Sequence, residues 1–405
     1  MAHGSAFLVV SDGLRPERQA CLPMAAPWPS PPAPARLSLW AVPSPVAVII
    51  DQLMLVMRQG DLAGFQRLFE RLATEGPRLS ADQLTAAIGE LAPVLAHRPE
   101  GVFARLALAA GAYVEWGGSP LALAASAPTC ALLTMRLHAR FSELWPMACG
   151  GRSEPSPEQA PAMDELIGLF RAAAGGLGLS GREAEAIALS WFDVGHWVNL
   201  MITVLGQREF RAVAGLLPEI GEAAAQLGDA VPRAHWLIGL AQVLDDEPLI
   251  VIDHTSGRGF RLTMSGIGDN FQLHTLLADR LIGDPARGFL SGERPTPAWV
   301  AAATTGPPRR PSGDPIQRRF RLFDGTGAYI YPEGSPADIP LVHGVRVIVL
   351  HPPRGSYRWA CGRTYEHMAS ALTLDEIMPP DEVHIWRTQI ASARETDLFG
   401  TAHRR

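Results

Sequence analysis

Residues 248–264 read Pro-Leu-Ile-Val-Ile-Asp-His-Thr-Ser-Gly-Arg-Gly-Phe-Arg-Leu-Thr-Met, and the pattern of the chain changes within this stretch. The apolar run at 249–252 contains β-branched residues, which is typical of a buried strand, and the alternating run at 260–264 is typical of a return strand. Between the two runs, Gly257 and Gly259 favour a tight turn. The sequence therefore predicts a β-hairpin at this point.

On the N-terminal side of the hairpin, residues 46–247 follow a helical pattern. Ser80 with Gln83, and Ser180 with Glu183, have the spacing of capping boxes at helix starts. After the first box, apolar residues recur three and four positions apart, as on the buried face of a helix (Leu84, Ile88, Leu91 and Leu95). Helices joined by Gly-Gly turns resemble HEAT-like and armadillo-like repeats. No constant period appears, so the pattern fits an irregular helical bundle equally well.

On the C-terminal side, helical and strand patterns alternate. Residues 268–282 predict a helix, and a final helix is predicted from 379. The run at 345–350 is apolar on both faces, which predicts a central strand covered on both sides. The whole pattern predicts an α+β multidomain protein, with an all-α helical domain at 46–247 and a smaller mixed α/β domain at 248–405. We expect the sheet of the second domain to be mainly antiparallel.

Two further segments are dominated by proline. Residues 1–45 are rich in Pro and Ala and predict a disordered tail. A second Pro-rich segment, at 303–317, is predicted to be a linker. Five arginines lie in or next to this linker, and such a charged group favours a solvated segment (Arg309, Arg310, Arg318, Arg319 and Arg321).

The basic residues exclude several kinds of chemistry. All 35 residues in the Lys+Arg total are arginines, so the chain of 405 residues contains no lysine. Schiff-base enzymes, attachment of pyridoxal phosphate and a P-loop nucleotide site all require a lysine amine. The sequence does not indicate which other cofactor, if any, the protein uses. The abundance of Ala, Gly, Pro and Arg is typical of a GC-rich bacterial genome.

Charge and cysteine usage bear on partners and location. A net charge of −6 argues against general binding to nucleic acid, which requires a basic surface. The four cysteines are scattered and fit a reducing compartment. We find no secretory signal and no apolar run of the roughly 20 residues that a membrane-spanning helix needs. We therefore expect a cytoplasmic protein without a membrane span.

The candidate site residues lie in the second domain. At 100° per residue, Asn270 and His274 share the apolar face of the predicted helix, whereas Asp269, Gln272 and Asp279 point away from it. A polar pair on a buried face either belongs to a hydrogen-bonded core network or lines a pocket.

Three more candidates belong to the hairpin. Asp253 and His254 follow its first strand, and Arg258 lies in its turn, where a guanidinium could bind an anion. The functional hypothesis groups these three with Asn270 and His274 in one pocket. The alternatives are that His254 and His351 are turn residues that hydrogen-bond the local backbone, and that Arg258 is simply an exposed turn arginine. His254, His274 and His351 are the candidate metal ligands, although their spacing matches no known metal motif.

Two functions remain open. The first is a bacterial interaction or regulatory protein, whose helical domain binds a protein partner while the α/β domain docks or senses. The second is an enzyme that uses the His/Asp/Asn pocket for acid–base or metal-assisted chemistry.

Overall fold

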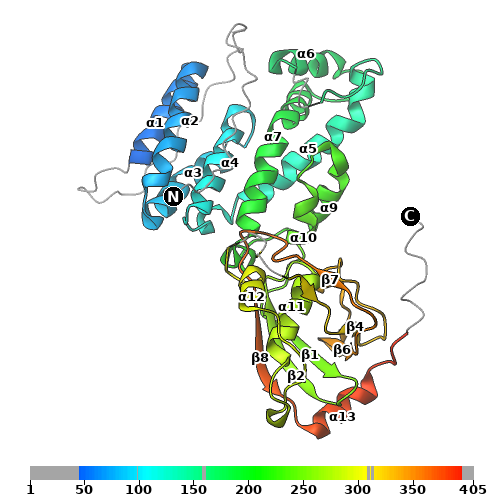
Figure 1. Cartoon of the computed structure of the whole chain (residues 1–405). Coiled ribbons are helices and arrows are strands. Elements are labelled where there is room, and N and C mark those ends of the chain that lie inside the picture. The colour runs from blue at the N-terminus through cyan, green and yellow to red at the C-terminus, as the bar shows by residue number, and fades with distance from the viewer. Residues whose placement is uncertain (1–44, 98, 157–160, 308–310, 312–313, 395–405) are drawn as a thin grey trace. The chain divides into compact units, whose positions relative to one another are not determined.

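The computed structural model describes residues 45–97, 99–156, 161–307, 311 and 314–394 (Figure 1). Within these residues the protein has two compact units. The first contains the described residues up to Val204 together with Val213–Leu237, and the second contains Leu205–Ala212 and the described residues from Ile238. The first unit is helical and the second is built around a sheet, so the predicted α+β architecture is confirmed. The predicted tail, apart from Pro45, lies outside the described residues.

The helices of the first unit begin where the sequence places their caps. The backbone N–H of Ser80 donates to Gln83 at 2.9 Å, and the backbone N–H of Ser180 donates to Glu183 at 2.9 Å, as in the two predicted capping boxes. The main helices of this unit are α1 (Pro45–Arg58), α2 (Leu62–Glu75), α3 (Ala81–His97), α4 (Leu106–Glu115), α5 (Ala127–Ala148), α6 (Met163–Ala173), α7 (Gly181–Leu205) and α9 (Leu217–Leu227).

Helix α7 is the one described helix that is long and apolar enough to cross a membrane by length and composition. However, 56% of its most apolar window is buried inside the protein, and Trp197 and Met201 within it are fully covered. A helix buried in this way forms part of a protein core. The finding is consistent with the expectation that the chain has no membrane span.

The second unit contains a mixed sheet in the order β4-β6-β1-β2-β8, with β5 paired to β6. Its strands are β1 (Glu247–Asp253), β2 (Gly259–Ser265), β4 (Arg321–Asp324), β5 (Leu341–Val342), β6 (Val345–His351) and β8 (Ala371–Ile377). Strands β1 and β2 form the predicted hairpin, in which Leu249 pairs with Leu262. Only the β1–β6 pairing is parallel among the described strands, so the sheet is mainly antiparallel as predicted.

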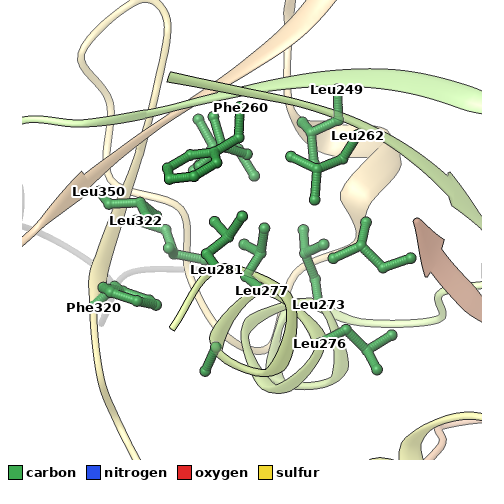
Figure 2. Packing of buried hydrophobic residues seen from close by; sticks show 14 of the residues in the cluster. Leu249, Phe260, Leu262, Leu273, Leu276, Leu277, Leu281, Phe320, Leu322 and Leu350 are labelled. Carbon is green, nitrogen blue, oxygen red and sulfur yellow. The ribbon is translucent and has the colours of Figure 1, made fainter. Parts of the chain in front are cut away.

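Helices cover both faces of this sheet. Helix α11 (Asn270–Leu281) packs its leucines on one face, where Leu249, Leu262 and Leu350 meet them (Figure 2). Helix α13 (Pro380–Gln389) places Val383 on the other face, against Ile250 and Val347. The predicted strand at 345–350 is therefore central and covered on both sides.

Two smaller elements complete the second unit beside α11. These are helix α12 (Pro297–Ala303) and a two-stranded ribbon of β3 (Ile316–Gln317) with β7 (Arg358–Trp359). Of the predicted linker, residues 308–310 and 312–313 lie outside the described part, while its two ends lie in α12 and β3. Arg321 is buried in β4, so a solvated position was a wrong expectation for this arginine.

Helix α11 is buried on more sides than its sequence indicates. Gln272 is 1% exposed and Asp279 is 7% exposed. The expectation that these two side chains point away from the core is therefore wrong. The reason is tertiary: the end of α12 covers Gln272, whose amide donates to the carbonyl oxygen of Ala303 at 2.7 Å.

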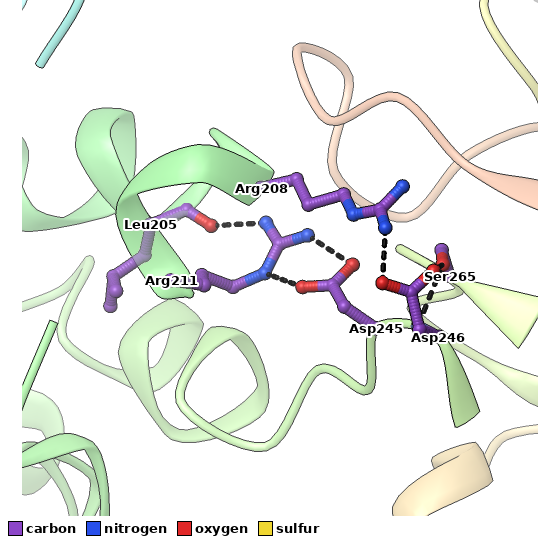
Figure 3. A network of polar contacts seen from close by, with 6 residues as sticks. All are labelled: Leu205, Arg208, Arg211, Asp245, Asp246 and Ser265. Atoms are coloured by element: carbon purple, nitrogen blue, oxygen red, sulfur yellow. Dashed lines mark hydrogen bonds and ion pairs between the residues drawn. The ribbon is translucent and has the colours of Figure 1, made fainter. Parts of the chain in front are cut away.

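A polar network joins two separate chain segments within the second unit (Figure 3). The Arg211 guanidinium of α8 (Arg208–Arg211) donates to both carboxylate oxygens of Asp245 at 2.8 Å and to the carbonyl oxygen of Leu205 at 2.6 Å. Arg208 pairs with the neighbouring Asp246. This network ties α8 to the segment that leads from α10 (His235–Leu240) into β1. Residues 205–212 and 238–247 therefore belong to the sheet unit, although their sequence pattern is helical.

Candidate functional site

His274, in the middle of α11, hydrogen-bonds the backbone of a distant segment through one ring nitrogen. Its Nε2 accepts hydrogen bonds from the backbone N–H groups of Arg319 and Phe320, both at 3.1 Å. Burial, together with the nearby charge of Arg318, lowers the pKa of His274 to about 3. The ring is therefore neutral, and because Nε2 is the acceptor, Nδ1 carries the proton. This Nδ1–H has no hydrogen-bond partner among the described residues.

Asn270, one turn earlier on α11, also has a hydrogen-bond partner for only one end of its side chain. Its side-chain amide donates to the carbonyl oxygen of Tyr331 at 2.9 Å, which anchors the 331–334 loop to the helix start. Its Oδ1 lacks a partner in the part of the chain that the structure describes, although the residue is only 2% exposed. His274 and Asn270 each hydrogen-bond the backbone, and each keeps one side-chain atom without a partner among the described residues.

Trp359 and Arg318 come from the β3–β7 ribbon and its end. The Trp359 ring meets the His274 ring edge to face at 4.7 Å between centroids. Arg318 donates to the carbonyl oxygen of Arg354 at 2.6 Å and lies over the ring of Tyr357. Trp359 Nε1 and Arg318 Nε are both buried nitrogens without a hydrogen-bond partner in the described residues.

These four side chains line one small hollow. Six further residues complete its wall (Phe271, Phe320, Leu322, Tyr329, Ile330 and Pro332). Its volume is about 10 Å³, about the space that one water molecule needs. Burial raises the pKa of Tyr329, so its phenol is neutral. The hollow thus combines three N–H donors and one carbonyl acceptor with an otherwise largely apolar wall.

The unpartnered atoms have an energetic consequence. A buried polar group without a hydrogen bond costs about 1–3 kcal/mol of stability. Structures keep such groups mainly where function requires them or where a small molecule satisfies them. Four of the residues with such atoms line one hollow, which has room for about one water molecule.

The hairpin candidates do not line this hollow. The Asp253 carboxylate accepts hydrogen bonds from the backbone N–H and the hydroxyl of Ser256, at 2.7 and 2.6 Å, and so closes the hairpin turn. The Arg258 guanidinium donates to the carbonyl oxygens of Pro285 and Phe289. Asp253 therefore supports the turn itself, whereas Arg258 ties the turn to the distant 285–289 segment.

The three candidate metal ligands are not assembled around one point. The His254 and His351 rings stack at 4.3 Å between centroids. Because side chains alternate along a strand, His351 lies on the opposite face of β6 from Leu350, which packs against α11 and its His274. In the described ranges, no three His, Cys, Asp or Glu side chains form a group that could hold a metal ion.

Sequence reasoning found Asn270 and His274 but missed Trp359 and Arg318. The pairing of Ile316 with Trp359 brings the ribbon together from distant parts of the chain, so no local sequence pattern predicts the ribbon. Arg318 was grouped with the linker arginines. The one available signal was the Tyr357-Arg358-Trp359 alternation, which places two aromatic rings on one side of a short strand.

Comparison with known proteins adds no identity. The chain matches no protein-family model, no curated protein and no solved structure.

Proposed function

We propose that this is a cytoplasmic bacterial interaction or regulatory protein whose sheet unit senses a small polar ligand in the hollow between α11 and the β3–β7 ribbon. The observation that carries the proposal is that four residues with an unpartnered buried polar atom, Asn270, His274, Arg318 and Trp359, line the same hollow. The helical unit is the part that binds a protein partner. Its support is the repeat-like succession of helices and turns, which is typical of partner-binding proteins.

A second candidate function is an enzyme, favoured by one observation. Asn270 and His274 line the same hollow, as expected for a pocket that performs chemistry. Because Nε2 of His274 already accepts two hydrogen bonds, the residue is not available as a general base. Its neutral Nδ1–H can only donate, so any reaction would rely on polarising a substrate oxygen.

Hydrogen exchange of the full chain tests the sensing proposal. We add an ultrafiltered small-molecule extract of a GC-rich bacterium and follow peptides that cover 270–275, 316–322 and 357–360. A ligand that satisfies the hollow should slow exchange in all three segments, because bound ligand stabilises the native state by mass action. Trp359→Phe should weaken this protection. Unchanged exchange in all three segments would contradict the proposal.

The same experiment separates the two functions. A sensed ligand survives incubation with the protein, whereas a substrate is consumed. Mass spectrometry of the extract before and after incubation distinguishes the two outcomes.

A further inference from the structure

The sheet of the second unit has two edges, and other described residues cover the backbone of only one of them. At the β4 edge, the backbone N–H of Ile330 donates to the carbonyl oxygen of Leu322 at 2.9 Å. The backbone N–H of Asp324 donates to the carbonyl oxygen of Ala328 at 2.8 Å, so residues 328–330 close this edge. At the other edge, β8 pairs with β2 alone, and its residues form no backbone hydrogen bond or bridge with any other described segment (Figure 1). Strand β8 is therefore an open edge.

An open edge of this kind can receive a further strand. Alternate residues of an antiparallel strand direct their N–H and C=O groups toward the partner strand, so about half of these groups in the seven-residue β8 face away from β2. Such a row of main-chain groups is a template for pairing with another chain. Peptides that bind in this way gain affinity from the main-chain hydrogen bonds and specificity from alternate side chains.

The side chains of β8 that face α11 are apolar. Leu372 is buried in the core cluster beneath α11, and Leu374 and Ile377 pack against this cluster while remaining partly exposed. Every second side chain of an added strand would lie on this same side of the sheet. Apolar side chains at those positions would remove the remaining exposed surface of Leu374 and Ile377 from water.

The side chains on the opposite side of β8 include two carboxylates. Asp375 accepts a hydrogen bond from the hydroxyl of Thr263 at 2.7 Å, and Glu376 lies 3.4 Å from the guanidinium of Arg261. Thr263 and Arg261 are two residues apart on β2 and share one face of it. Both carboxylates therefore lie on this face, next to the open edge.

Negative charge is in excess along this face. The guanidinium of Arg261 is shared between Glu376 and Glu382 of α13. Residues 371–382 contain four acidic residues and no arginine, lysine or histidine (Asp375, Glu376, Asp381 and Glu382). This charge attracts a basic segment and opposes the pairing of β8 with a second copy of itself, which would bring the same carboxylates together at one edge.

We propose that the open edge of β8 binds an extended segment of a partner protein in which basic residues alternate with apolar residues. The basic side chains lie beside Asp375 and Glu376, and the apolar side chains lie beside Leu374 and Ile377. This inference goes beyond the proposed function, because it gives the sheet unit a protein-binding surface of its own and does not depend on the hollow.

The probe for this surface is an alternating valine–arginine peptide as long as the seven-residue β8, added to the full chain. Bound peptide should slow hydrogen exchange of the backbone amides in 371–377, and a fluorescent label on the peptide should report saturable binding. A valine–glutamate peptide of the same length should bind at least about tenfold more weakly, because its charges meet the carboxylates of β8. A fully N-methylated valine–arginine peptide keeps the charge but cannot donate from its backbone, so it should also bind at least about tenfold more weakly.

Three carboxylate variants show whether the acidic side of β8 contributes. Each of Asp375→Asn and Glu376→Gln should weaken binding of the valine–arginine peptide by about two- to fivefold, as for loss of one exposed ion pair. Glu90→Gln, on the exposed side of α3 in the helical unit, changes the net charge by the same amount and should leave binding unchanged. Thermal unfolding of the three variants confirms that they are folded.

Slowed exchange in 371–377 that weakens in the Asp375 and Glu376 variants supports the proposal. If the valine–arginine peptide leaves exchange in 371–377 unchanged, the proposal is wrong. It is also wrong if the N-methylated or the valine–glutamate peptide binds equally well. Sedimentation of the full chain alone tests a second copy as the occupant: a dimer with protected 371–377 amides would overturn the proposal.

Discussion

Two sets of buried polar side chains lie around α11, and they differ in how completely they are hydrogen-bonded. Gln272 uses both ends of its amide, donating to Ala303 and Ser370 at 2.7 Å and accepting from the backbone of Gly268 at 2.9 Å. His274, two residues later, leaves one ring nitrogen without a partner in the described structure. Both residues are nearly inaccessible to solvent, so burial alone does not explain the difference.

The same contrast appears between two tryptophans of one hydrophobic cluster. Trp299 and Trp359 are 2% and 6% exposed and pack in the same cluster. Trp299 Nε1 donates to the carbonyl oxygen of Asp314 at 2.9 Å, whereas Trp359 Nε1 lacks a partner among the residues described. The core around α11 can therefore provide hydrogen-bond partners for buried polar groups. Among the described residues, unpartnered buried side-chain atoms belong to four residues that line the hollow and also to His138, Asn199 and Arg346.

We expect the largest loss of stability when a substitution removes the charged partner of Arg211 from its polar network. Asp245→Asn leaves the buried Arg211 guanidinium without its counter-ion, and we expect a loss of about 3 kcal/mol in the free energy of unfolding. The neighbouring Asp246→Asn removes an exposed ion pair with Arg208 and should cost less than about 1 kcal/mol. Chemical denaturation of the two variants measures the difference. Equal losses would show that the network does not stabilise the sheet unit.

The next effect compares two amides on α11. Gln272→Leu removes all the hydrogen bonds of a saturated amide, and we expect a loss of about 2–3 kcal/mol. Asn270→Leu removes one hydrogen bond and also one unpartnered acceptor, so the two contributions offset each other and the loss should stay below about 1 kcal/mol. Denaturation curves give both values. If Asn270→Leu proves more destabilising than Gln272→Leu, the distinction between fully and partly hydrogen-bonded side chains is wrong.

We expect a smaller difference in stability between the same substitution at two tryptophans, Trp299 and Trp359. Trp299→Phe and Trp359→Phe remove the same volume from one cluster, but only the first removes a hydrogen bond. We expect Trp299→Phe to be about 1 kcal/mol more destabilising than Trp359→Phe. Thermal unfolding of the two variants under one condition checks this. If Trp359→Phe proves the more harmful, its N–H has a partner in solution.

A further expected effect concerns the pH dependence of stability. In the unfolded chain His274 takes up a proton below its ordinary pKa of 6.5, whereas in the folded protein its pKa is lowered to about 3. The folded state therefore loses stability as pH falls below 6.5. His138 and His196, with pKa values lowered by burial to about 4, contribute in the same direction. His274→Gln should make the loss of stability between pH 6.5 and 5 shallower, by about one proton, as denaturation at several pH values will show. An unchanged slope would mean that His274 is charged in the folded protein.

The fold could be predicted from the sequence where local pattern and tertiary burial agree. Strand β1, the hairpin and the doubly covered β6 all follow from the run of apolar residues and the turn glycines. Residues 205–212 are different, because they belong to the sheet unit through contacts with a distant segment, such as the pairings of Arg211 with Asp245 and of Arg208 with Asp246.

The candidate site could be predicted only in part. The 100° spacing correctly placed Asn270 and His274 on a buried face, because that property is local to one helix. Trp359 and Arg318 reach the hollow through the β3–β7 pairing, which depends on contacts between distant segments. Asp253 was a plausible partner by position, but Ser256 satisfies its carboxylate three residues away.

The central claim is that the hollow's unpartnered donors receive a ligand while comparable donors in the same cluster do not. The most direct measurement compares the indole N–H signals of Trp359 and Trp299 in one spectrum of the full chain, before and after addition of the small-molecule extract. We expect the Trp299 signal to lie downfield throughout, because its N–H donates to the carbonyl oxygen of Asp314, and only the Trp359 signal to move downfield when the extract is added. A Trp359 signal that is already downfield and does not respond to the extract would contradict it.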